Sequence, residues 1–337
     1  MRAAVFKGAG KPLQIESVPD PTPLEGEMII EVGRCGICGT DLHMTDGHGA
    51  MQVPAGHILG HEYAGQIVAL GTGVVDFRVG DRITAMPTAG CGHCPACLKG
   101  EPKWCPERRS LQGGYGQYLR TKATSARKLG ANLSLDDGAL VEPLAVGLHG
   151  VERARLKVGD RVLVIGAGPV GLAVVHWARR MGAGRIAVTA SSARRADMAM
   201  SMGATCFVAS SATTAQEVTE ALGGAPDVVF ECVGVPGMIE ASCQYVKPTG
   251  TVCVLGFCTD RDHWLPVTPL FKEVDVIFAV LYALRDFQVA IDTLDAGSVE
   301  PRRMITDRIS LDETPAMFEA LRQRTHQCKV LIDPWRA

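Results

Sequence analysis

The chain has 337 residues, 47% of them apolar and 21% charged, with a formal net charge of −2. These values are typical of a globular protein of roughly two domains. Neither half carries a block of Lys and Arg, which argues against nucleic-acid binding because phosphate contacts need clustered positive charge. The longest apolar run, residues 162–175, is interrupted by glycine and shorter than the ~20 residues of a membrane span, so we expect no membrane partner.

The first residues and the cysteines indicate where the protein resides. The N-terminus, MRAAVFKGAGK, becomes charged and glycine-rich before any apolar segment of a signal peptide forms. We therefore expect a cytoplasmic protein. In that reducing compartment the 12 cysteines are expected to be thiols and metal ligands rather than a disulfide framework.

The first 150 residues or so predict a mostly β domain. They are rich in Gly and Pro, and short β-type runs, separated by turn signals, occur at 28–32, 65–70 and 81–86. Within this part, GRCGICGTDLH places Cys35 and Cys38 two residues apart, before Thr, Asp and His. From spacing alone this is a redox pair, half of a metal site, or one ligand with a spare neighbour.

Two further motifs in the first half carry possible metal ligands at dispersed positions. GHILGHEYAG contains His61 and Glu62, and VEPLAVGLHG contains Glu142. A catalytic zinc takes three protein ligands and leaves one position open for water or substrate. Taken singly, His61 is better interpreted as a core histidine with its hydrogen bonds satisfied, and Glu142 as a carboxylate at a helix start, favoured by the helix dipole.

A single loop between these motifs predicts a structural zinc site. CGHCPACLKGEPKWC has the spacing C-x2-C-x2-C-x7-C, and four thiolates at these separations can close a tetrahedron around Zn²⁺ with no open position. Disulfides between close neighbours are disfavoured in the expected compartment. His93 lies in the loop but is surplus to a four-coordinate site. The four predicted ligands are Cys91, Cys94, Cys97 and Cys105.

From about residue 151 strands and helices alternate. Apolar strand patterns occur at 161–168, 185–190, 227–234 and 251–257. A helix is predicted at 170–181, and a second helix follows the strand at 185–190 and runs through residue 202. Such a βαβ series predicts a parallel sheet with helices on both faces. After residue 290 we expect a helix, an extended stretch at 304–311, a helix at 316–324 and a last strand at 328–333, an ending that could rejoin the first domain.

The turn VLVIGAGPVG predicts a dinucleotide site. Gly166, Gly168 and Gly171 follow an apolar strand and open a helix in G-x-G-x-x-G register, where they allow a tight turn, approach of a pyrophosphate, and close helix–strand packing. The phosphates would lie at the helix N-terminus. The alternative is an ordinary glycine turn. Further expected cofactor contacts are Pro169, Val170, Cys232 and Val233.

The end of the second strand favours NADP over NAD. An NAD-specific protein carries Asp or Glu there to bind the ribose hydroxyls, whereas this chain has Ala190. The lack of a carboxylate and the supply of hydroxyl and guanidinium donors suit a 2′-phosphate. The alternative is that these arginines form only the exposed first turn of a helix. The donors are Ser191, Ser192, Arg194 and Arg195.

Taken together, these motifs resemble the zinc-dependent branch of the medium-chain dehydrogenase/reductase family, close to alcohol, sorbitol and threonine dehydrogenases. The likeness covers essentially the whole chain. It rests on CGICGTDLH, PAGHILGHEYAG, the four-cysteine loop, GGYGQYL, EPLAVGLHG, GAGPVG and KVLI. It implies an α/β protein in which a GroES-like β domain, residues 1–148 and 290–337, surrounds a Rossmann domain, residues 149–289.

The resemblance also implies a ligand set for a catalytic zinc. The family's cysteine ligand precedes Gly-Thr-Asp, which indicates Cys38 and leaves Cys35 as a buried neighbour. His61 would be the second ligand, and Glu142 occupies the third-ligand position. Glu62 corresponds to a carboxylate beside the metal that binds it directly in some relatives, so the choice between Glu62 and Glu142 is open.

Four other roles follow from the same resemblance. Asp41 corresponds to the carboxylate that holds the ligand histidine in its tautomer. Thr40 and His43 match the family's proton relay. Lys329 matches a basic position near the cofactor pyrophosphate.

The implied function is that of a zinc-dependent alcohol dehydrogenase or ketone reductase. It would transfer a hydride between a small alcohol, most simply a secondary one, and NADP, as a homodimer or homotetramer. The alternatives are a polyol or amino-alcohol dehydrogenase and, from another class, a non-catalytic nucleotide sensor. The sensor is disfavoured because an open metal position has no structural use.

Overall fold

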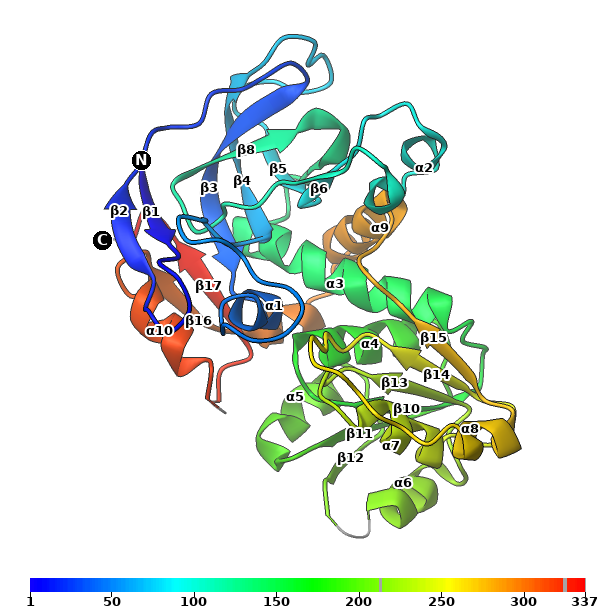
Figure 1. Cartoon of the computed structure of the whole chain (residues 1–337). Helices are drawn as coiled ribbons and strands as arrows, with labels where there is room; N and C mark the ends of the chain where they lie inside the picture. The colour runs from blue at the N-terminus through cyan, green and yellow to red at the C-terminus, as the bar shows by residue number, and fades with distance from the viewer. Residues whose placement is uncertain (212–213, 324–325, 337) are drawn as a thin grey trace. The chain divides into compact units, whose positions relative to one another are not determined.

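The computed structural model describes residues 1–211, 214–323 and 326–336. The chain divides into two compact units, Met1–Ala145 with Tyr282–Ala337 and Val146–Leu281. Figure 1 shows both, with the chain ends in the first. The predicted domain limits lie a few residues further along the chain at both crossings. No helix in the described ranges is both long and apolar enough to cross a membrane.

The first unit is built on a mainly antiparallel sheet. Within the described residues its strand order is β16-β17-β3-β4-β5-β9, and β8 also pairs with β3. The strands are β3 (Glu27–Gly36), β4 (Glu62–Leu70), β5 (Arg82–Ala85), β8 (Tyr118–Lys122), β9 (Ala126–Lys128), β16 (Ile305–Ser310) and β17 (Lys329–Asp333).

The central strand β3 fixes the position of both neighbours. Gly36 at its end pairs with Glu62 at the start of β4, and also with Leu331 of β17. Because both pairings are antiparallel, the first residues of β4 and β17 lie beside the last residues of β3. The C-terminal strand therefore joins a sheet formed by the N-terminal half.

Shorter elements complete the first unit. β1 (Arg2–Val5) pairs with β2 (Gln14–Ser17), and β6 (Thr88–Ala89) pairs with β7 (Arg109–Ser110). The helix α3 (Leu135–Arg153) contains the first crossing between units. The remaining elements are α1 (Gly39–His43), α2 (Pro95–Leu98), η1 (Pro102–Trp104), η2 (Ala123–Ser125), α9 (Leu284–Asp295), η4 (Glu300–Met304) and α10 (Thr314–Ala320).

The core of this unit lies where the sheet meets the loops around α1 and α10. Alternate residues of β3 and β4 point into it, as expected for strands with one buried face. The largest buried side chains are Tyr63, Tyr115, Phe318, Met28, Ile30, Leu59, Ile67 and Ile83.

The second unit is a parallel sheet flanked by helices. In the described chain its order is β12-β11-β10-β13-β14-β15, with every pair parallel. The elements are β10 (Arg161–Ile165), α4 (Pro169–Arg180), β11 (Arg185–Ala190), η3 (Ala193–Arg195), α5 (Ala196–Ser201), β12 (Cys206–Ala209), α6 (Thr214–Leu222), β13 (Val228–Glu231), α7 (Met238–Tyr245), β14 (Thr251–Val254), α8 (Val267–Lys272) and β15 (Asp275–Phe278).

The strand order confirms the predicted fold class. From β10 the chain proceeds outward to β11 and β12, then returns to the other side of β10 with β13. This reversal is the switch point at which doubly wound sheets bind nucleotides. The predicted helix at 316–324 corresponds to α10, Thr314–Ala320, and Arg324 lies outside the described residues.

The start of α3 is held by a buried carboxylate. Asp137 Oδ2 accepts hydrogen bonds from the Ser134 backbone N–H at 2.9 Å and hydroxyl at 2.7 Å, which is a capping arrangement. Its carboxylate also binds Arg302 through both oxygens, at 2.6 and 3.2 Å. Burial alone raises the pKa of Asp137, but these donors outweigh it and the net pKa is lowered.

We predict that Asp137→Asn lowers the free energy of unfolding by about 2 kcal/mol at pH 7. Because the pKa is lowered in the folded state, this stabilisation is present above the unfolded value, about 4, and is lost as the pH falls through the folded value. Thermal unfolding of both proteins between pH 3 and 7 should show the difference shrinking with acid. Exposed Asp312→Asn is the control, and a difference independent of pH would contradict the prediction.

Candidate functional site

A thiol, an imidazole and a carboxylate meet at the end of β3. One ligand atom from each of Cys38, His61 and Glu62 lies within 4.8 Å of the others. Cys38 directly precedes α1, His61 directly precedes β4, and Glu62 is the first residue of β4. The antiparallel pairing of β3 with β4 brings the three together. His61 and Glu62 are buried, whereas Cys38 is half-buried.

Asp41 orients the histidine. Its Oδ1 lies 3.2 Å from His61 Nδ1, while its Oδ2 accepts hydrogen bonds from the Tyr115 hydroxyl at 2.7 Å and the Cys38 N–H at 3.2 Å. Asp41 is fully buried. With Nδ1 engaged, Nε2 is the nitrogen that remains for a metal. Tyr115 is a residue that sequence reasoning missed.

The contact between Asp41 and His61 shifts the pKa of both groups in the direction opposite to the effect of burial. Burial alone raises the pKa of Asp41, but the imidazole and the two donors outweigh it, and the net pKa is lowered. Burial lowers the pKa of His61, but Asp41 and then Cys38 outweigh it, and the net pKa is raised well above its ordinary value. A bound cation would compete with a proton for this histidine.

Glu62 is bound by a buried lysine. Lys329 Nζ lies 2.6 and 2.5 Å from the two carboxylate oxygens of Glu62, and 3.1 Å from the Ile37 carbonyl. Burial alone lowers the pKa of Lys329, but Glu62 outweighs it and raises the pKa. The predicted contact of Lys329 with a cofactor pyrophosphate stays a prediction, because its observed partner is a carboxylate.

Among the described residues, Glu142 is not part of the group formed by Cys38, His61 and Glu62. It is buried on α3, and its Oε1 accepts a hydrogen bond from the Tyr282 hydroxyl at 2.9 Å. Burial raises the pKa of Glu142 to about 7. Tyr282 is fully buried and belongs to the segment just before α9. It is a second residue that sequence reasoning missed in this role.

This donor set fits a divalent cation. Asp41, Glu62 and Glu142 are buried carboxyl groups, and the ammonium of Lys329 is bound to only one of them. Burying an unpaired carboxylate is costly, and the raised pKa of Glu142 reflects that cost. Thiolate, imidazole and carboxylate are the ligands that zinc takes in proteins.

The predicted relay residues lie on α1, next to this group. Thr40 and His43 are both half-buried. The C-terminal end of α1 is held by Arg322, which donates to the Leu42 carbonyl at 3.0 Å and to the Thr45 hydroxyl at 2.9 Å. No sequence motif pointed to Arg322.

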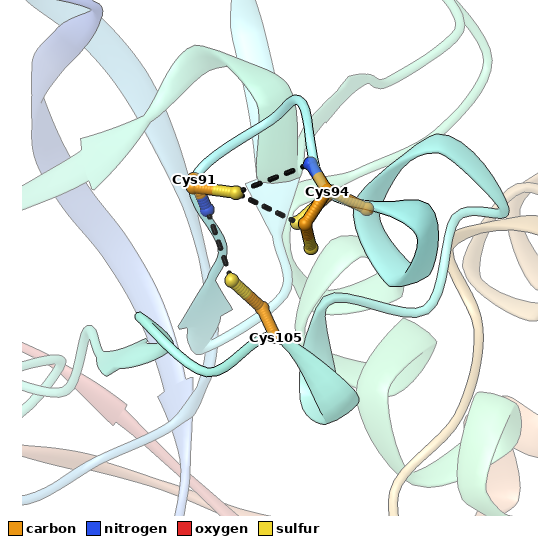
Figure 2. Close-up of side chains that lie close together, drawn as sticks. Cys91, Cys94 and Cys105 are labelled. Atoms are coloured by element: carbon orange, nitrogen blue, oxygen red, sulfur yellow. Dashed lines mark hydrogen bonds between the residues drawn. The ribbon is translucent and has the colours of Figure 1, made fainter.

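The four cysteines of the loop form a group of their own, which shares no residue with the group around Cys38. Their sulfurs lie within 4.8 Å of one another, and Figure 2 shows Cys91, Cys94 and Cys105 turned toward one another. The Cys91 N–H donates to Cys105 Sγ at 3.3 Å, and the Cys94 N–H donates to Cys91 Sγ at 3.3 Å. Cys97 Sγ is 4.0 Å from Cys91 Sγ. Backbone donation, first from His93, lowers the pKa of Cys91 to about 6.

The glycine turn in the second unit has the geometry of a phosphate-binding loop. Gly166 has a φ of 106°, and a Cβ on Gly171 would lie 2.0 Å from the Gly166 carbonyl oxygen. A Cβ on Gly168 would meet nothing within 4 Å, so the chain is open to a ligand there. Pro169 and Val170 begin α4, whose N-terminal N–H groups favour an anion.

The loop after β11 carries the predicted 2′-phosphate donors. Ala190 ends the strand, and Ser191 and Arg194 are exposed. The Arg194 guanidinium lies 3.2 Å from the Ser192 hydroxyl, and the Arg195 guanidinium donates to the Ala167 carbonyl at 3.1 Å. Arg195 therefore ties this loop to the glycine turn.

Cys232 and Val233 follow β13, the strand beside β10 at the switch point. The buried Glu231 carboxylate accepts hydrogen bonds from the N–H groups of Val233 at 2.7 Å and Gly234 at 2.9 Å. Burial raises the pKa of Glu231. This carboxylate fixes the turn on which Cys232 and Val233 lie, and sequence reasoning did not single it out.

Two family models match the chain. The alcohol dehydrogenase GroES-like domain matches residues 24–131, and the zinc-binding dehydrogenase model matches residues 169–296. Among curated proteins, the sorbitol dehydrogenase of Bacillus subtilis is 33% identical, with 100% of this chain and 98% of that protein covered.

Solved structures of dehydrogenases are also similar to this chain. The 2R,3R-butanediol dehydrogenase of Bacillus subtilis superposes with a TM-score of 0.86 at 29% identity, covering 99% of each chain. A zinc-binding dehydrogenase of Sinorhizobium meliloti, solved bound to NADP, superposes with a TM-score of 0.87 at 32% identity, again covering 99% of each chain.

The geometry predicts which glutamate binds metal. Glu62→Gln should weaken zinc binding at this group about tenfold or more, whereas Glu142→Gln should weaken it less, because only Glu62 lies with Cys38 and His61. Equilibrium dialysis of each variant against a zinc buffer measures this. The opposite order of affinities would identify Glu142 as the ligand.

Proposed function

Since the chain belongs to the zinc-dependent medium-chain dehydrogenase/reductase family, we propose that it oxidises a secondary alcohol, and reduces the matching ketone, with NADP(H). The buried group of Cys38, His61 and Glu62 carries this proposal. Three protein ligands leave a tetrahedral ion one open position, which a structural zinc does not need.

The residues around the site have separable roles in this proposal. Cys38, His61 and Glu62 would hold the zinc, and Asp41 keeps the His61 ring in place. When bound, zinc supplies Lewis acidity that lowers the pKa of an alcohol hydroxyl, and the nicotinamide supplies the hydride acceptor. Glu142, held by Tyr282, would border the open position.

Lys329 allows Glu62 to serve as a ligand in a buried place. A carboxylate has about four lone-pair sites, so Glu62 can accept from the ammonium and still present an oxygen to a metal. The ammonium offsets the negative charge that Glu62 adds beside Cys38. Lys329 is thus proposed as a positioning residue for Glu62.

Thr40 and His43 are proposed as the path by which the alcohol proton leaves. Thr40 would accept the proton and His43 would release it to solvent, since an imidazole can both accept and donate a proton. The placement of both on α1, immediately after Cys38, supports this path.

A polyol is the second candidate substrate. Sorbitol and 2,3-butanediol, named in two of the relatives, both carry hydroxyl groups on adjacent carbons. The likeness to these two proteins favours a secondary alcohol with a neighbouring hydroxyl. A panel of simple secondary alcohols, vicinal diols and sugar alcohols, assayed for oxidation, separates the two candidates.

The exposed edge of the second unit supports the expected homodimer or homotetramer. β15 has one neighbour in the described sheet, and large apolar side chains are exposed on and near it. An unpaired apolar edge favours a second copy as its partner. These side chains are Leu270, Phe271, Phe278 and Val280.

The decisive test of the function is Cys38→Ser. We expect alcohol oxidation to fall at least about 1,000-fold, because the zinc that activates the hydroxyl would no longer be held in place, while binding of NADP(H), followed by fluorescence, changes little. Cys35→Ser, at the buried neighbouring cysteine, is the matched control and should remain active. Activity that survives in Cys38→Ser protein freed of zinc would rule the mechanism out.

Cofactor preference is tested separately. Arg194→Ala should lower kcat/KM with NADP by about 10- to 100-fold, the value of one charged hydrogen bond, and leave kcat/KM with NAD nearly unchanged. Arg194 is the cleaner choice because Arg195 also bonds the glycine turn. Arg180→Ala, at an exposed arginine of α4, is the control. An equal fall with both cofactors would contradict the assignment.

A further inference from the structure

The imidazole of His93, the histidine of the four-cysteine loop, has no role in the sites described above. His93 lies between Cys91 and Cys94 and is exposed. One ligand atom from each of Cys91, His93 and Glu107 lies within 4.8 Å of the others. These three residues thus form a second possible metal-binding group, which shares the Cys91 sulfur with the group of four cysteines.

The fold explains why Glu107 meets the beginning of the loop. Strands β6 and β7 pair Ala89 with Arg109. Cys91 follows Ala89 by two residues and Glu107 precedes Arg109 by two, so the pairing holds both ends of the loop side by side. Glu107 is exposed, like His93.

The two groups differ in their access to solvent. Cys105 is fully buried, and the other three cysteines are half-buried. A hydrated ion that binds the four sulfurs has to lose its waters at a place where one of the ligands is fully buried. The trio of Cys91, His93 and Glu107 instead offers two exposed ligands of the kinds that zinc accepts, nitrogen and carboxylate oxygen.

We propose that Cys91, His93 and Glu107 form an outer zinc-loading site for the four-cysteine centre. Zinc is held there by one sulfur, one nitrogen and one oxygen, with water in the remaining position. Cys91 keeps its bond while Cys94, Cys97 and Cys105 replace His93, Glu107 and the water. No oxidation occurs, and each thiol that binds releases its proton to solvent. The same steps in reverse release the ion.

This inference rests on the proposed zinc at the four cysteines, and the experiment distinguishes the two. The Cys38→Ser protein is used throughout, so that the only proposed zinc is the one in the loop. Its zinc content, measured by plasma mass spectrometry, first shows whether the loop holds an ion. A zinc-free Cys38→Ser protein would overturn both the loop assignment and the loading site.

The loading site is then tested by isotope exchange. Full-length protein carrying natural zinc is incubated with a buffer enriched in one stable zinc isotope, and the isotope ratio of the recovered protein is followed over time. His93→Asn and Glu107→Gln should each slow exchange about tenfold, the lower end of the effect of losing a group beside a metal. Zinc content and thermal midpoint should be unchanged, because all four sulfurs remain.

The control removes a carboxylate from the same loop outside the trio. Glu101→Gln should exchange zinc at the rate of the parent protein. Exchange rates in His93→Asn and Glu107→Gln equal to that of Glu101→Gln would overturn the proposal. A fall in zinc content in His93→Asn would also overturn it, since His93 would then be part of the closed centre.

Discussion

The compensation of buried negative charge is the constraint around which the first unit is organised. Asp41, Glu62 and Glu142 are all buried, and one ammonium, Lys329, lies among them. An unpaired carboxylate in a protein interior is costly, so such a group is tolerated only with a partner or a bound ion. Burial raises the pKa of Glu142 to about 7, which reflects this cost. The divalent cation proposed above would meet this requirement.

The sheet produces this concentration of charge through strand direction. β3 ends at Gly36, directly before Ile37 and Cys38; His61 directly precedes β4, which begins with Glu62; and β17 begins with Lys329. Because β3 runs antiparallel to both neighbours, these three strand ends coincide. A residue inserted into β3 would shift the register of both pairings, and with it the ligands against the ammonium.

The parts of the site that sequence could predict are those held by local chain geometry. The cysteine loop spans residues 91–105 and the glycine turn 166–171, so spacing and flanking elements were enough to identify them. Contacts between residues that the fold brings together from distant parts of the chain could not be predicted from the sequence. Lys329 and Glu62 are 267 residues apart, Tyr282 and Glu142 are 140 apart, and Tyr115 and Asp41 are 74 apart.

The prediction of strands and helices from the sequence has the same limit, because some of them depend on distant parts of the chain. The strands with strong apolar runs were predicted near their observed positions, whereas β12 and β15, the two edge strands of the second sheet, were not assigned individually. An edge strand has a sheet neighbour on one side only and buries less of its surface, so its own residues carry a weaker apolar pattern. The helices α6, α7 and α8 lie between these strands and were missed with them.

The two proposed metal centres differ in how much of the protein must fold before they exist. The catalytic group would take ligands from beside the ends of β3 and β4, and Lys329 of the C-terminal strand contacts one of them, so it requires a sheet built from both segments of the first unit. The four cysteines belong to one loop, whose ends are joined by the two-residue strands β6 and β7. Closing a loop of that length costs little entropy, and metal binding contributes to folding where the unfolded chain has no preformed site. The proposed loop centre therefore depends on local chain closure, whereas the proposed catalytic group depends on the pairing of distant strands, which places Lys329 beside Glu62.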